Sequence, residues 1–142
     1  LAISVGVSSV LNSRLVKRLG MMRLASVGLV IMISFSSLFL AYIFFWQGHP
    51  PLRVTMFFLS CLFFQLGFLM GNLNAMAMEP MGERAGIAAT VIGGISTSIS
   101  WACGTIIGQN YQKTIVPLIT GWFLLSTLAF IAIRLGAAVD RE

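Results

Sequence analysis

Residues 71–94 read GNLNAMAMEPMGERAGIAATVIGG. This stretch contains all the charged residues found between positions 54 and 112, which are Glu79, Glu83 and Arg84. The flanking segments, 54–78 and 85–112, carry no charge at all. Each is long enough to cross the roughly 30 Å hydrocarbon core of a bilayer, which takes about 20 helical residues. The stretch therefore predicts a short polar turn between two membrane-spanning helices.

The residues of this turn suit a reversal of the chain. Pro80 lacks an N–H and favours an extended backbone at Glu79, so we expect the first helix to end there. Gly82 tolerates the backbone conformations that a tight turn requires. Glu83 would lie at the positive N-terminal end of the next helix. The two helices are therefore predicted to run antiparallel.

The composition excludes a water-soluble globular domain. Hydrophobic residues make up 58% of the chain and charged residues only 9%, whereas soluble domains are about a quarter charged. Barrel strands alternate apolar and polar residues, and the charge-free runs here do not. We predict an all-α polytopic membrane protein forming one domain over residues 1–142. Its four full spans and one partial span are expected at 24–46, 54–78, 85–112, 114–133 and, for the end of a fifth helix, 1–13.

The positions of the basic residues predict the orientation. Helices alternate in direction, and seven of the nine Lys and Arg residues then fall on one side of the membrane. Basic loops stay in the cytoplasm. The turn at 79–84 and the C-terminus are therefore predicted to be cytoplasmic. This topology accounts for the net charge of +5 without a nucleic-acid partner.

Reporter fusions test this orientation. A fusion after Glu142 is expected to report the cytoplasm, and a fusion at His49 the opposite side, because of the imbalance in basic residues. A non-cytoplasmic signal at Glu142 would reverse the topology.

Two stretches resemble a known family. GNLNAMAMEPMGERAGIAATVIGGIS, residues 71–96, resembles the junction between the tenth and eleventh helices in the bicyclomycin-resistance (Bcr/CflA) branch of the major facilitator superfamily. The elements Asn-x-x-Ala, Glu-Pro-x-Gly and Ala-Gly-x-Ala carry the similarity. LNSRLVKRLGMMRL, residues 11–24, is similar to the cytoplasmic loop between the eighth and ninth helices, through Arg18, Gly20 and Arg23.

The resemblance implies the C-terminal half of a twelve-helix, major-facilitator-type bundle. Such a protein exports lipophilic or amphiphilic drugs in exchange for protons across the bacterial inner membrane, by alternating access between two six-helix halves. It needs no cofactor. The missing N-terminal half would hold the proton relay, since no full span here has an acidic residue in its interior. The resemblance implies a cytoplasmic loop and gate formed by Arg18, Gly20, Arg23, Glu79, Pro80 and Arg84. Glu79 either locks this gate or caps the turn.

Polar residues inside the spans are the candidate substrate contacts. Gln65, Asn72 and Glu79 are seven residues apart and so share one helix face, which should point into the bundle or a cavity. The alternative role is hydrogen bonding between helices. Trp101 lies at a similar depth to Gln65, and we expect both to face one central cavity. Trp101 would stack on a flat or cationic compound or pack against neighbouring helices. The candidates are Gln65, Asn72, Thr97 and Trp101.

Small residues recur at spacings of about four and predict close helix packing. One set lies in the span 54–78 and the other in the span 85–112. The predicted packing residues are Gly67, Gly71, Gly93, Gly104 and Gly108.

The chain lacks the patterns that enzymes need. It has no nucleophile–base pair, phosphate-binding loop or paired acids. Cys61 and Cys103 lie within spans and His49 stands alone, so no metal site is predicted. Two other functions remain open: a non-transporting membrane scaffold or subunit, and a metabolite permease of the same superfamily. Six further spans upstream, with a membrane-embedded acid, would favour the antiporter.

Overall fold

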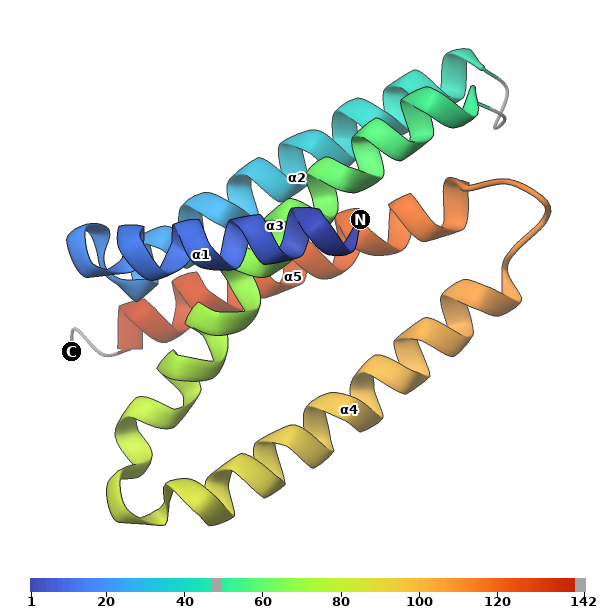
Figure 1. Cartoon of the computed structure of the whole chain (residues 1–142). Helices are drawn as coiled ribbons and strands as arrows, with labels where there is room; N and C mark the ends of the chain where they lie inside the picture. The colour runs from blue at the N-terminus through green and yellow to red at the C-terminus, as the bar shows by residue number, and fades with distance from the viewer. Residues whose placement is uncertain (47–49, 140–142) are drawn as a thin grey trace.

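The computed structural model describes residues 1–46 and 50–139, and this part of the chain is helical apart from short connections. Figure 1 shows the arrangement. The elements are α1 (Ala2–Leu19), α2 (Met21–Phe45), α3 (Leu52–Met78), the 3₁₀ helix η1 (Glu79–Arg84), α4 (Ala85–Gln109) and α5 (Val116–Val139). Helices α2 to α5 are each long and apolar enough to cross a membrane. The predicted all-helical class with four membrane-length helices is confirmed.

The basic segment between the first two helices is itself helical. The resemblance predicts a cytoplasmic loop within residues 11–24, but α1 continues to Leu19 and α2 begins at Met21. Only Gly20 breaks the helix, with φ 79° and ψ 154°, a conformation that glycine adopts readily. Lysine and arginine are good helix formers and are favourable in the last turn of a helix, where Lys17 and Arg18 lie. The charged residues of this segment therefore mark where the apolar part of α1 ends, while the helix itself continues to Leu19.

The turn that joins α3 to α4 lies where the sequence predicts it. α3 ends at Met78, and Gly82 has a φ of 46° and a ψ of −124°, so this residue reverses the chain. The expectation of an extended Glu79 was wrong, because its φ of −52° and ψ of −44° are helical. Pro80 lies in the first turn of η1, where its missing N–H leaves no hydrogen bond unmade. The chain therefore tightens into a 3₁₀ turn before it reverses.

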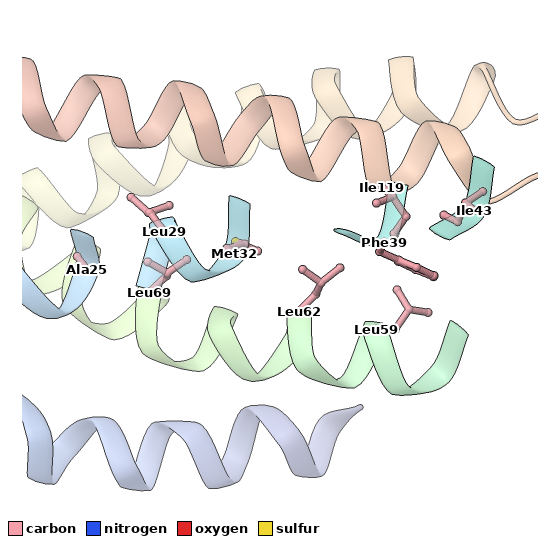
Figure 2. Close-up of a cluster of buried hydrophobic side chains, with 9 residues drawn as sticks. All are labelled: Ala25, Leu29, Met32, Phe39, Ile43, Leu59, Leu62, Leu69 and Ile119. Atoms are coloured by element: carbon pink, nitrogen blue, oxygen red, sulfur yellow. The ribbon is translucent and has the colours of Figure 1, made fainter. Parts of the chain in front are cut away.

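Two helices pack on α3, and α5 completes the bundle. α1 and α2 both lie against α3, while α5 lies against α2. The core, drawn in Figure 2, is formed by one face of α2, one face of α3 and a single residue of α5. Its members are Ala25, Leu29, Met32, Phe39, Ile43, Leu59, Leu62, Leu69 and Ile119. The ring of Phe39 stacks on Phe58 with 4.4 Å between ring centroids.

α4 lies apart from this bundle. None of its residues, from Ala85 to Gln109, is buried. In Figure 1 it is joined to the other helices through η1 at one end and through the connection to α5 at the other. Within the described part of the chain, the close contact of α4 with the bundle is near its C-terminal end, where the Ile107 side chain lies against Gly121 of α5.

Candidate functional site

A hollow of about 390 Å³ opens beside Gln65, in the middle of α3. Seven residues from three helices line it: Ser4 of α1, Phe35 of α2, and Phe57, Ser60, Cys61, Phe64 and Gln65 of α3. Counted from Phe57, the other α3 residues follow at three, four, seven and eight positions, which places all five along one face of the helix. Small-molecule sites are mostly apolar with a few polar groups that orient the ligand. Three phenyl rings with one amide and two hydroxyls fit that description.

The Gln65 amide is available to a ligand. Its Oε1 faces α2 near Gly28, 3.9 Å from the point where a Cβ on that glycine would be. None of the hydrogen bonds among the described residues involves Gln65. An amide without a partner is costly in apolar surroundings. A bound molecule with one polar group would therefore gain a hydrogen bond here.

Asn72 lies in a helix contact and not in this hollow. Its Nδ2 donates to Asn12 Oδ1 of α1 at 2.8 Å, and Asn12 Nδ2 donates to Asn72 Oδ1 at 3.2 Å. Asn72 Nδ2 also donates to the backbone carbonyl of Phe68 at 2.8 Å. With its side chain only 2% exposed and both N–H groups used, Asn72 makes the hydrogen bonds between helices that the sequence leaves open as its alternative role.

Gly67 and Gly71 lie where α1 crosses α3. A Cβ on Gly67 would overlap the Ser8 hydroxyl and would lie 2.7 Å from the Val5 carbonyl oxygen. A Cβ on Gly71 would lie 3.4 Å from Asn12 Nδ2. The glycines thus allow the two helix backbones to approach closely, as small residues do in membrane bundles.

The partners of these glycines, Ser8 and Asn12, are not among the residues predicted from the sequence. Both are buried, at 0% and 8% exposure. They are four residues apart, the same spacing as Gly67 and Gly71, and this match was the signal that could have identified the contact.

The glycines of α4 are in a different situation. Nothing lies within 4 Å of a Cβ built on Gly93, Gly104 or Gly108. Their predicted packing partners are absent from the described part of the chain.

Trp101 and Thr97 line a separate, open hollow on α4. It has a volume of about 690 Å³, and its other lining residues are Gly93, Gly94, Ser98 and Ala102. Trp101 is 74% exposed. The expectation that Gln65 and Trp101 share one cavity does not hold in this structure, because rise per residue gives depth along a helix and not the direction in which each helix faces. A substrate contact by Trp101 stays a prediction.

Four of the six gate candidates meet at the cytoplasmic end of the predicted topology. Gly20, Arg23, Glu79 and Pro80 line a hollow of about 680 Å³, together with Leu19, Met21, Met22 and Met76. The hollow lies between the α1–α2 junction and the end of α3, and its lining includes a basic residue, Arg23, and an acidic one, Glu79. Arg18 and Arg84 are exposed and do not line it.

Metal-binding side chains do not gather in the part of the chain that the structure describes. In residues 1–46 and 50–139 no three His, Cys, Asp or Glu side chains gather in a way that could hold a metal ion. Cys61 and Cys103 are free thiols, and His49 lies outside the described residues. Neither a family model, nor a curated protein, nor a solved structure matches the chain.

Proposed function

We propose that this chain is the C-terminal half of a major-facilitator-type transporter that exports lipophilic or amphiphilic small molecules from the bacterial inner membrane in exchange for protons. The observation that carries the proposal is the Gln65 hollow. It combines an amide that has no hydrogen-bond partner with three phenyl rings, and it lies beside the middle of α3, a membrane-length helix. The resemblance of residues 71–96 to the drug-export branch gives the transport class and its direction.

The lining of the hollow favours transport over a purely structural role. Polar side chains inside a membrane are costly and are by default functional. An amide that served packing alone would form hydrogen bonds with a neighbouring helix, as Asn72 does with Asn12. Gln65 instead lies beside a space large enough for part of a small organic molecule.

The phenyl rings and the Gln65 amide have different roles in ligand recognition. Phe35, Phe57 and Phe64 supply apolar surface and ring edges on which an aromatic ligand packs. Gln65 orients the ligand through one hydrogen bond and discriminates against compounds that lack a polar group at that position.

The positions of charged residues suggest where proton binding and the closing of the cytoplasmic entrance take place in the transport cycle. The described parts of α2 to α5 contain no Asp or Glu, so the proposal places the proton-binding acid in the N-terminal half. The hollow lined by Arg23 and Glu79 would narrow when the cytoplasmic entrance closes, because these opposite charges attract.

Replacing Gln65 by alanine tests this function. In cells that make the full transporter, we expect Gln65→Ala to change the ratio between export of ethidium and export of the uncharged N-phenyl-1-naphthylamine by about three- to tenfold, the effect of one lost hydrogen bond in a membrane site. Efflux is measured by fluorescence and normalised to the amount of protein in the membrane.

The matched control is Asn74→Ala, which removes an exposed amide from the same helix. Its export ratio should equal that of the unsubstituted protein. If Gln65→Ala lowers export of both compounds in proportion to protein abundance, Gln65 holds the bundle together and the scaffold function is favoured.

A further inference from the structure

One face of α1 meets α3 at three levels. Ser4, Ser8 and Asn12 are four residues apart and therefore lie along the same face of the helix. Ser4 forms part of the wall of the Gln65 hollow, Ser8 lies against Gly67, and Asn12 is hydrogen-bonded to Asn72. The contact between α1 and α3, called the seam below, thus has the Asn12–Asn72 amide pair at one end and the Gln65 hollow at the other.

The amide pair fixes the register of this seam. Its two reciprocal bonds can form in only one alignment of α1 with α3. A slip of one helical turn, about 5.4 Å, would break both, leaving the Asn12 amide without this partner and the Asn72 carbonyl oxygen unpaired in apolar surroundings. Contacts between Ser8 and Gly67 alone are less selective, because small residues present similar surfaces at successive turns. A single buried asparagine sets helix register in coiled coils in the same way.

The orientation of Asn72 is itself held in place. Its third hydrogen bond, from Nδ2 to the Phe68 carbonyl, ties the side chain to its own helix. The amide is therefore presented to Asn12 in one orientation, which makes it a fixed reference point for α1.

We propose that Asn12 and Asn72 are positioning residues for the Gln65 hollow. They fix α1 along α3 and so hold Ser4, about 12 Å from Asn12 by helix rise, against the hollow. In this way they set the shape of the hollow and its preference among ligands without touching a ligand. The inference rests on the proposed function for its transport consequences, whereas the positioning itself can be measured without transport.

The first experiment measures positioning directly. Cys61 lines the hollow, and Cys103 on the distant α4 serves as the internal reference. The rate at which N-ethylmaleimide alkylates each thiol is followed by peptide mass spectrometry in membranes. Asn72→Leu is expected to change the Cys61 to Cys103 rate ratio by about three- to tenfold, because two hydrogen bonds between the helices are lost. Asn74→Leu, the exposed amide of the same helix, should leave the ratio unchanged.

The second experiment replaces the amide pair by a covalent link. A Cβ on Gly71 would lie 3.4 Å from Asn12 Nδ2, so cysteines at these two positions would face each other across the contact between α1 and α3, as a disulfide requires. The variant Asn12→Cys/Gly71→Cys lacks the amide pair when reduced and gains a tether between α1 and α3 when oxidised. We expect the ethidium to N-phenyl-1-naphthylamine export ratio to shift on reduction and to return toward that of the unsubstituted protein on oxidation. The two single cysteine variants, treated identically, correct for oxidation elsewhere.

The outcomes separate the two proposals. An unchanged alkylation ratio in folded Asn72→Leu overturns the positioning role, as does an export ratio that stays shifted after the tether has formed. If Asn72→Leu does not accumulate, Asn72→Ala takes its place in the alkylation measurement. If the unsubstituted protein exports neither compound, the transport function fails, and the alkylation ratio still decides whether the amide pair positions α1.

Discussion

Replacing Gly67 with leucine is expected to destabilise the bundle by about 3 kcal/mol, the upper end of the usual cost of overpacking. A Cβ at this position already overlaps Ser8 and approaches the Val5 carbonyl oxygen to 2.7 Å. A side-chain rotation can move the Ser8 hydroxyl, but only a displacement of α1 can move the backbone of Val5. The substitution should therefore separate α1 from α3. The measurement is thermal unfolding of the purified protein in detergent.

The control is Gly104→Leu, in the middle of α4. Nothing lies within 4 Å of the added Cβ there, and an exposed helix position usually tolerates substitution within about 0.5 kcal/mol. Both variants add the same side chain to a membrane-length helix, so their hydropathy changes equally. Equal unfolding temperatures for the two variants would show that α1 and α3 do not meet at Gly67.

Truncating Phe39 to alanine should cost about 3 kcal/mol of stability, as large-to-small changes in a packed core do. The side chain is fully buried, and its ring stacks on Phe58 with an interplanar angle of 1°. In a bilayer the loss comes mainly from van der Waals contacts that nothing replaces, since lipid is as apolar as the removed ring. Unfolding in detergent again provides the measurement.

Phe44→Ala is the matched control, because Phe44 lies on the same helix and is 85% exposed. We expect its unfolding temperature to stay close to that of the unsubstituted protein. A loss of stability as large as that of Phe39→Ala would mean that the outer face of α2 is packed as well.

The helices and the central turn follow from local patterns, which is why they could be predicted. Long apolar runs predict spans through the thickness of the bilayer alone. Pro80 and Gly82 mark the turn through restrictions that act on the backbone of one or two residues. Neither inference requires knowing which helix lies beside which.

The site depends on lateral contacts, which such patterns do not encode. Gln65 and Asn72 share a predicted face of α3, yet one lines a hollow and the other is hydrogen-bonded to Asn12. Which role each has depends on where α1 crosses α3. The crossing in turn depends on the match between Ser8 and Gly67, which are far apart in the sequence.

The two sets of small residues make the same point. Gly67 and Gly104 lie in similar sequence patterns, but only Gly67 meets a neighbouring helix. A small residue permits close approach and does not supply the partner. The partner on α1 had to offer small side chains at the same spacing, and Gly93, Gly104 and Gly108 of α4 meet no such surface in the described part of the chain.

The separation of α4 from the bundle has a consequence for how this helix lies in a bilayer. Its 25 residues measure about 37 Å along the axis, more than the roughly 30 Å of hydrocarbon that it must cross. A helix with excess length tilts or thickens the bilayer around it, and neighbours normally limit the tilt. No residue of α4 is buried, and its close contact with the bundle is made near one end, by Ile107 against Gly121. Its mean hydropathy of 1.4 is the lowest of the four spans. Its tilt should therefore respond to lipid chain length more than that of α2, α3 or α5.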